Sequence, residues 1–270
     1  MFTQLAILAM WSAQPSAHAV PVERAWSILQ EGAGSKSPYT RANAVHALAV
    51  LVGNRRAQEM AEKALADPDT NVRVEAATSL GQIGGISARP KLKAALEDPQ
   101  MKVVIAAANS LWTLRDPAAY EVYYALLTGE RKGSNGLLQS ELSTLKDRKS
   151  AEKLAFETGI GFVPFGGMGW EAWKTVTKDD TSPVRAAAAE RLAHDPDSKS
   201  GEALAAACSD KKWRVRAAVV NAIAKRGDPA LLPPVETLLL DGNETVRFDA
   251  AAAVIRLSAI FDERHRTTPN

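Results

Sequence analysis

The 270-residue chain has a single cysteine, Cys208, and only 6% aromatic residues. One cysteine cannot form an intrachain disulfide framework or a metal site made of cysteines alone. There is no excess of charge of one sign either, because 33 basic residues face 31 acidic ones and leave a net charge of +2. Dedicated nucleic-acid-binding proteins usually carry a larger or a clustered positive charge. We therefore expect no nucleic-acid partner.

Long apolar runs and catalytic motifs are also missing. No stretch reaches the roughly 18 apolar residues that a membrane-spanning helix needs. The patterns H-E-x-x-H, C-x-x-C, G-x-S-x-G and Walker A do not occur. Residues 167–172 match G-x-G-x-x-A, but they lack the preceding strand that gives this motif its meaning. We predict no catalytic residue, no metal site and no cofactor.

What the chain does contain is alanine, with 48 residues, and a period of 31. Small side chains let helix backbones approach closely, so this composition is typical of tightly packed helices. Aspartates mark the period at spacings of 31, 81, 31 and 31, and a valine follows each of them five residues later. These aspartates are Asp67, Asp98, Asp179, Asp210 and Asp241.

Each period contains the apolar stripes of two helices. In the repeat at 67–97, the first stripe runs from Val72 to Leu80 with offsets of 0, 4, 5 and 8, which is one face of a helix. The second helix carries apolar columns such as Leu96, Leu127, Cys208 and Leu239, so we interpret Cys208 as a packing residue. Neither helix can bury its stripe alone, and stacked neighbours would close the core.

The period divides the chain into about six helix-pair repeats. They are predicted at 35–66, 67–97, 98–128, 129–159, 179–209 and 210–240. Residues 20–34 are predicted to form an N-terminal capping helix, 241–260 a terminal half-repeat, and 261–270 a frayed polar tail. Asp-Pro pairs such as Asp67-Pro68 are expected to cap helix starts, and Gly84 and Gly227 to end first helices in the left-handed conformation.

Residues 67–84 read Asp-x4-Val-Arg-x2-Ala-Ala-x2-Leu-Gly-x-Ile-Gly. This motif resembles the HEAT-like repeat of the phycobilisome-lyase type, and the resemblance extends over residues 35–260. It implies an all-α, right-handed α-solenoid with a convex and a concave face. The arginine of the family motif is matched by Arg41, Arg73, Arg185, Arg216 and Arg247, whereas Val104 departs from it. We interpret these arginines as structural, in ion pairs at the helix start with the preceding aspartate.

The resemblance implies a non-enzymatic scaffold that binds a protein or peptide along its concave face, since HEAT-like arrays mostly serve this purpose. The alternative is a lyase-like or other cofactor-dependent enzyme or accessory factor. Deoxyhypusine hydroxylases are also similar in fold, but they hold two irons through His-Glu pairs. None of the four histidines of this chain is followed by glutamate, which argues against that chemistry.

An apolar, glycine-rich insertion at 160–178 interrupts the period. It carries Phe162, Phe165, Trp170 and Trp173. Residues 159–170 contain five glycines and a proline, which exclude a stable helix there. One interpretation is that the insertion fills the seam between two repeat blocks. The other is a docking loop for a partner or, through residues 160–170, for a membrane surface.

Two tyrosines, Tyr120 and Tyr124, stand outside the apolar columns of their second helix. They lie four residues apart and therefore on one face. Tyrosine is enriched at binding hot spots, so this face is a predicted partner-binding patch. The alternative is that both rings pack against a neighbouring repeat. Tyr123, which falls in an apolar column, is predicted to be core.

Residues 1–19 lack any Asp, Glu, Lys or Arg and end on the A-x-A pattern Ala17-His18-Ala19. The pattern predicts a signal peptide cut after Ala19 and an exported, periplasmic or otherwise extracytoplasmic protein. The basic residues that usually precede the apolar run are missing here. The alternative is therefore a hydrophobic N-terminal helix on a cytoplasmic protein.

Overall fold

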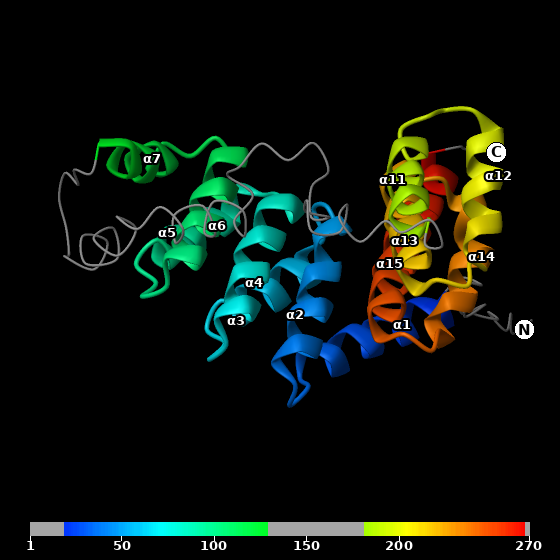
Figure 1. Ribbon diagram of the computed structural model, residues 1–270, viewed down its shortest axis with the longest axis horizontal. Helices are drawn as coiled ribbons and strands as arrows, with labels where there is room; N and C mark the ends of the chain where they lie inside the picture. Colours follow the sequence, from blue (N-terminus) through cyan, green and yellow to red (C-terminus); the bar gives the residue numbers. More distant parts are fainter. Residues whose placement is uncertain (1–18, 129–180, 268–270) are drawn as a thin grey trace, which may run out of the picture.

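The computed structural model describes residues 19–128 and 181–267, which form twelve α-helices, four 3₁₀ turns and no strand (Figure 1). Helix pairs recur with the predicted period and stack side by side, so an all-helical α-solenoid is confirmed. The predicted signal peptide before Ala19, the predicted repeat at 129–159 and the whole insertion at 160–178 belong to other parts of the chain. They lie outside the described residues.

Two rows of helices make up the array. The first helices of the repeats are α2 (Pro38–Ala47), α4 (Thr70–Ile83), α6 (Met101–Thr113), α11 (Ser182–Leu192), α13 (Trp213–Arg226) and α15 (Glu244–Thr267). The second row consists of α1 (Ala19–Ala33), α3 (Arg55–Ala64), α5 (Arg89–Ala95), α7 (Ala118–Thr128), α12 (Ser198–Ala207) and α14 (Leu232–Thr237). The 3₁₀ turns η1 (Leu48–Val50), η2 (Ile86–Ala88), η3 (Pro229–Leu231) and η4 (Leu238–Leu240) flank second-row helices.

The order of the first helices in space differs from their order in the chain. Contacts between consecutive first helices run α11, α13, α15, α2, α4, α6, so the C-terminal repeats precede the N-terminal ones in the stack. Helix α1 packs extensively on α15 and also on α2 (Figure 1). The predicted capping helix is therefore no cap. It completes the predicted terminal half-repeat, and the two ends of the chain together make one composite repeat, α15 with α1.

A continuous apolar core runs through both blocks and through the composite repeat. Ala25, Trp26 and Leu29 of α1 are buried in it, together with Phe248 and Leu257 of α15. Burial of such side chains is worth about 1.5–3 kcal/mol for each large one. The composite repeat is thus a packed part of the fold, and the core does not stop where the chain begins or ends.

Each described column aspartate forms a turn just before a first helix by accepting a backbone N–H two residues further along the chain. Asp67, Asp98, Asp210 and Asp241 each accept the backbone N–H two residues on, at 2.8–2.9 Å. The residue that caps α4 is Asp69, whose carboxylate accepts the N–H groups of Asn71 and Val72. The expectation that Asp67 itself caps the helix is thereby corrected. At Asp67 the same Oδ1 that forms this local turn also accepts from Nη2 of Arg41, and Oδ2 accepts from its Nε.

Those arginines join neighbouring repeats. The guanidinium of Arg73 pairs with Asp98 at 2.7 Å and also donates to the backbone oxygen of Asp67 at 2.9 Å. Arg216 makes the same contacts with Asp241 and Asp210. Two further arginines pair with the aspartate of the following repeat in the same way, namely Arg41 with Asp67 and Arg185 with Asp210. Their structural role agrees with the prediction, but the carboxylate belongs to the following repeat, and only the carbonyl comes from the preceding aspartate.

Helix ends match the predicted glycines in part. Gly227 ends α13 in the left-handed conformation with φ 66° and ψ 31°, as expected. Gly84 ends α4 with φ 80° but ψ −178°, so the chain leaves in an extended direction there. At the C-terminus, α15 continues through Thr267, seven residues into the stretch predicted to fray.

Candidate functional site

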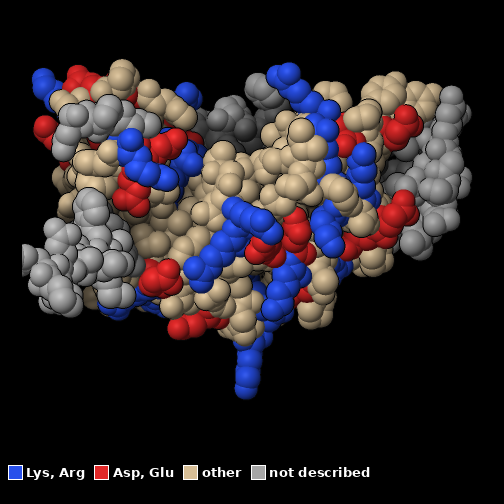
Figure 2. Space-filling view, turned by 180° about the vertical axis from the view of Figure 1, so that it is seen from behind, with Lys and Arg blue, Asp and Glu red and all other residues tan. Residues whose placement is uncertain are grey.

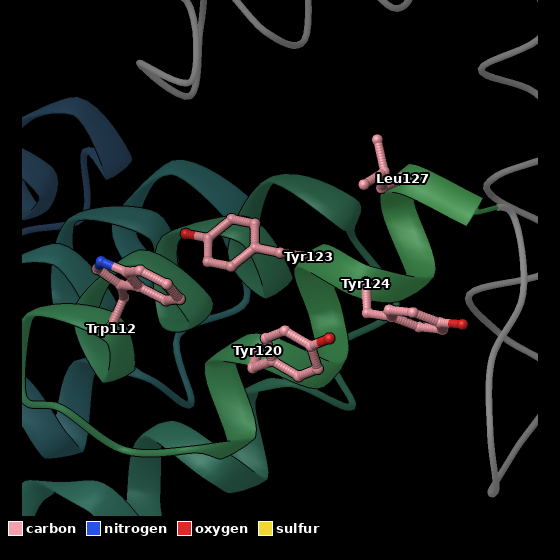
Figure 3. Close-up of a pocket in the computed structure, with 5 residues that line it drawn as sticks. All are labelled: Trp112, Tyr120, Tyr123, Tyr124 and Leu127. Atoms are coloured by element: carbon pink, nitrogen blue, oxygen red, sulfur yellow. The ribbon is translucent and has the colours of Figure 1, made fainter.

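An exposed aromatic patch lies on α7 and on the end of α6 (Figure 3). It surrounds a pocket of about 420 Å³ and consists of Trp112, Tyr120, Tyr123, Tyr124 and Leu127. We call these five residues the aromatic patch. Tyr120 and Tyr124, which the sequence singles out as a binding face, both belong to it.

Ring contacts order the patch. The rings of Tyr120 and Tyr124 lie 6.0 Å apart and are tilted by 31°, which places them on one face of α7 as the spacing of four predicts. The rings of Trp112 and Tyr123 meet edge to face at 5.6 Å and 86° (Figure 3). The Tyr123 hydroxyl donates to Oδ1 of Asn109. These contacts hold α6 and α7 together and fix the shape of the pocket.

Much of the patch nevertheless faces solvent. The exposed fraction is 57% for Tyr120, 60% for Trp112 and 87% for Leu127. Tyr123 is half-buried and packs against the core, as predicted, although its ring also lines the pocket. Single exposed apolar residues are common on soluble proteins, whereas a cluster around a pocket is typical of an interaction site.

A buried carboxylate positions the start of α7. Asp116 is 5% exposed and accepts the N–H of Ala118 at 3.0 Å and the ammonium of Lys93 at 3.0 Å. Burial acts to raise the pKa of Asp116, but the Ala118 N–H and the charges of Lys93 and Arg89 hold that pKa below its ordinary value. The ionised Asp116 thus ties α5 to the turn before α7, and this fixes the direction in which the tyrosines project.

Sequence reasoning missed two members of the patch. Trp112 follows the buried Leu111 directly and therefore points away from the apolar stripe of α6. Leu127 belongs to the column of Leu96, Cys208 and Leu239 and was expected to be buried. No described helix stacks on that side of α7, so Leu127 stays exposed, whereas Cys208 is buried as predicted. Desolvation raises the pKa of the Cys208 thiol to about 11, which suits a packing residue.

The other predicted binding residues lie outside the described part of the chain. They are Phe162, Phe165, Trp170 and Trp173. Their proposed contact with a partner or a membrane surface therefore stays a prediction. Within 19–128 and 181–267, no helix is long and apolar enough to cross a bilayer, and no group of His, Cys, Asp and Glu has the arrangement of a metal site.

The described charged side chains do not gather into a patch as the aromatic ones do. On the face shown in Figure 2, Lys and Arg alternate with Asp and Glu without forming a field of one sign. The aromatic patch offers π-faces, apolar edges and phenol hydroxyls. Chemically, this arrangement can bind apolar or aromatic side chains of a partner and donate or accept a few hydrogen bonds.

Two solved structures are similar to this chain at low sequence identity. No curated protein matches the chain. The solved structure of human deoxyhypusine hydroxylase in complex with glycerol is 18% identical and covers 89% of this chain and 98% of its own, with a TM-score of 0.33. An engineered protein is 15% identical, with 87% and 97% covered and a TM-score of 0.29. Likeness at this level carries no inference about activity.

The family model describing HEAT repeats matches residues 27–128 and 171–255, which is more than half of the chain. The matched stretches include both helix rows and part of the composite repeat. The narrower phycobilisome-lyase type stays a prediction. The chain belongs to the HEAT-repeat proteins.

Proposed function

We propose that this HEAT-repeat chain is a non-enzymatic scaffold that binds a protein or peptide through the aromatic patch. One observation carries the proposal: Trp112, Tyr120 and Leu127 are each more than half exposed and surround one pocket. The second-row helices, among them α7, would provide the concave binding face that the family resemblance implies. A partner that presents a large apolar or aromatic side chain to this pocket fits its chemistry best.

The size and composition of the pocket support this choice of ligand. A volume of about 420 Å³ accommodates one or two large side chains but not a folded surface. Its lining comes from rings that are already held in place by Asn109 and by ring–ring contacts, so little side-chain entropy is lost on binding. A short peptide with an aromatic or aliphatic anchor is therefore the expected occupant.

The test is a binding measurement with the double variant Tyr120→Ala/Tyr124→Ala. Peptides are first selected from a displayed random library on the wild-type chain, and their affinities are then measured by fluorescence polarisation. We expect the double variant to bind at least tenfold more weakly, because truncation of a hot-spot residue costs about 2 kcal/mol or more. The melting temperature should stay within about 2 °C of the wild-type value, because the two rings contribute little to the core.

Tyr39→Ala provides the matched control. Tyr39 lies on α2, outside the patch, and is 65% exposed, so its removal tests for a general effect of losing a surface tyrosine. This control should bind the selected peptides as the wild type does. Equal binding by the double variant and the control would refute the proposed site. A drop of many degrees in the melting temperature of the double variant would instead assign both tyrosines to packing against a further repeat.

The enzymatic alternative keeps its own criterion. A lyase-like or other cofactor-dependent role would require a bound chromophore or a stoichiometric metal in the purified protein.

We further propose that the scaffold is exported, on the grounds of the A-x-A pattern at 17–19. Cleavage after Ala19 would leave the buried face of α1, which begins at Ala25, in place. Attachment to a membrane surface through residues 160–170 is a separate proposal that rests on their sequence alone.

A further inference from the structure

The composite repeat contains a seam where the C-terminal block meets the N-terminal block. Helix α15 of one block contacts α1 and α2 of the other. On the first-helix side, α15 and α2 contact each other over fewer residues than any other pair of consecutive first helices in the described array. On the second-helix side, α1 packs on α15 as extensively as neighbouring first helices do elsewhere. The seam is thus strong on one side and weak on the other.

The arginine–aspartate ion pairs between consecutive repeats, which we call the arginine ladder, are interrupted at this seam. Arg41 donates to the backbone oxygen of Ser35, as Arg73 does to that of Asp67, so Ser35 occupies the position of the column aspartates. Serine offers no carboxylate to the preceding arginine, Arg247. Arg247 donates to the carbonyl of Asp241 in its own repeat, and among the described residues it makes no ion pair across the seam.

Contacts without an ion pair join the two blocks where the arginine–aspartate pair is missing. The Thr40 hydroxyl lies 3.2 Å from both carboxylate oxygens of Glu244. The guanidinium of Arg256 donates to the carbonyls of Ala224 and Val50, each at 2.8 Å, and so bridges the end of α13 to η1. Neither contact joins two opposite charges. The first-helix side of the seam therefore lacks the arginine–aspartate ion pair that joins every other pair of consecutive first helices in the described residues.

A buried carboxylate lies in the same place. Asp249 of α15 is 4% exposed, and its Oδ1 has no hydrogen-bond partner among the described residues. Three other described repeats have alanine at this position, namely Ala106, Ala187 and Ala218. Asn43 of α2 occupies the same repeat position across the seam, and its buried Nδ2 is also unpartnered. An underpaired buried polar group is costly, and an ionised one more so.

The charged groups around Asp249 and their partners come from four helices, α2, α4, α11 and α13. His46 of α2 bonds to Glu75 of α4 through Nδ1 at 2.8 Å and interacts electrostatically with Asp249. Lys225 of α13, which pairs with Glu190 of α11, acts to lower the pKa of His46 because the two cations repel each other. Asn221 of α13, whose side chain donates to the Ala217 carbonyl at 3.3 Å, also acts to lower the pKa of Asp249. Helices α1 and α14 contribute apolar side chains to the shared core.

We propose that the α15–α2 contact is a proton-sensitive joint. It is closed while Asp249 is neutral, and it opens on the first-helix side, about the α1–α15 packing, when Asp249 ionises. The reason is that an ionised carboxylate with one orphaned oxygen draws water in between the two helices, and no ion pair resists their separation. The α1–α15 packing is apolar and does not titrate, so it acts as the hinge.

The direction of the pH effect follows from the titration of Asp249. Burial raises the pKa of Asp249 from 3.8 to about 7, against the opposing effects of His46 and Asn221. The hydrogen bond to Glu75 raises the pKa of the half-exposed His46 from 6.5 to about 8. Both pKa values are higher in the folded chain than in the unfolded one. The closed joint is therefore most stable at low pH, and it loses stability as the pH rises from the ordinary pKa of Asp249 toward about 7. The His46–Glu75 bond lies within the N-terminal block, so its own titration does not oppose or favour opening of the joint directly.

The experiment measures the distance across the joint in the full chain. Spin labels are placed on Asn71→Cys, at the start of α4, and Lys211→Cys, just before α13, in a Cys208→Ala background. Three helix-to-helix steps separate the two sites, which corresponds to about 30 Å and suits pulsed electron paramagnetic resonance. Between pH 5.5 and 8.5 we expect the distance distribution to lengthen or broaden, with a midpoint at or below pH 7.

Variants assign the effect to Asp249. Asp249→Asn keeps the shape of the protonated side chain and should hold the closed distance at every pH. Asp249→Ala introduces the alanine that three other described repeats have at this position, and it serves the same purpose if the asparagine variant does not fold. Asp197→Asn is the matched control, because Asp197 is an exposed cap of α12 and asparagine caps equally well, so the wild-type response should remain. His46→Gln removes a nearby cation and should move the midpoint to higher pH.

Two results would overturn the proposal. One is a wild-type distance distribution that does not change between pH 5.5 and 8.5. The other is an Asp249→Asn or Asp249→Ala variant that opens with pH as the wild type does. The titration of the wild-type chain needs no Asp249 variant, so the first of these results can be obtained whatever the variants do.

Discussion

At the residue scale, one side chain type links neighbouring repeats: the arginine that follows the column valine. Its guanidinium is planar and presents several donors at fixed angles, so it can hold a carboxylate of the next repeat and a carbonyl of its own repeat at once. Arg216 shows the full arrangement, with Asp241 at 2.6 and 2.7 Å and the Asp210 carbonyl at 2.7 Å. Lysine, a single point charge, could not make all three contacts.

Arg216→Ala tests the ladder. Loss of the guanidinium leaves the Asp241 carboxylate, which is 5% exposed, with only a backbone N–H as partner. We expect a loss of about 2–3 kcal/mol in the free energy of unfolding, which corresponds to a melting temperature lower by several degrees. Urea unfolding followed by circular dichroism measures this difference.

Arg247→Ala is the control for that change. Arg247 occupies the same position, but it donates to the carbonyl of Asp241 at 2.7 Å, and no described carboxylate pairs with it across the seam. Its removal should cost clearly less than that of Arg216. Equal losses for the two variants would mean that the carbonyl contact, and not the ion pair between repeats, provides the stabilisation.

At the scale of the element, α1 depends on one glycine for its place in the fold. A Cβ built on Gly32 would lie 2.6 Å from Cζ of Phe248 and 2.7 Å from the Cβ of Ala44. Three helices, α1, α15 and α2, therefore come together at this point, and two of them belong to opposite ends of the chain. Only a residue without a side chain permits this approach.

Gly32→Ala should destabilise the protein although alanine favours helices. Helix propensity alone would add up to about 1 kcal/mol. The overlap with Phe248 and Ala44 costs about 1–3 kcal/mol, because a buried aromatic ring and a backbone-anchored methyl group cannot easily give way. The net result should be a lower melting temperature, measured by differential scanning calorimetry.

Gly242→Ala separates the overlap from the general effect of replacing glycine. A Cβ at Gly242 would meet no atom within 4 Å. This variant should melt at the wild-type temperature or slightly above it, because alanine restricts the unfolded chain more than glycine does. A Gly32→Ala protein as stable as Gly242→Ala would contradict the close packing of α1 against Phe248.

At the scale of the whole molecule, the array is continuous in space but not in sequence. The composite repeat lies in the middle of the described stack, between α13–α14 on one side and α2–α3 on the other. Arg56 of α3 stacks over the ring of Trp26 in α1 at 4.4 Å, which continues the second row across the seam. Both chain ends are therefore needed to join the two blocks.

Truncation from the N-terminus tests this arrangement. Removal of residues 1–34 deletes α1 and uncovers the face of α15 that holds Trp26 and Leu29, at a cost on the order of 5 kcal/mol of apolar burial. Hydrogen exchange should then lose protection in α15 as well as in α2, although α15 lies more than 200 residues away in the sequence. Removal of residues 1–18 alone serves as the control and should leave both helices protected. Unchanged protection of α15 after the longer truncation would return α1 to the role of a terminal cap.

Much of the candidate site could be predicted from sequence, and the reason is geometric. A spacing of four places Tyr120 and Tyr124 on one helix face wherever the helix lies, and the rings are found 6.0 Å apart. Trp112 belongs to another helix, and its approach to Tyr123 depends on how α6 and α7 cross. Leu127 follows the same packing column as Cys208, yet one is exposed and the other buried. That difference depends on which neighbour stacks on each helix, and periodicity within one helix contains no such information.

The sequence by itself determined the repeats: the period of 31, the two amphipathic helices in each unit and the aspartate and arginine columns all follow from local spacing, because helix geometry relates positions in the chain directly to faces. Only the tertiary structure decided the order of the stack. The composite repeat pairs α1 with α15 because each has an apolar stripe that no neighbour in the sequence covers, and burial depends on the area removed from water and not on distance along the chain. The partner of each arginine and the position of Asp249 at the seam follow from that order.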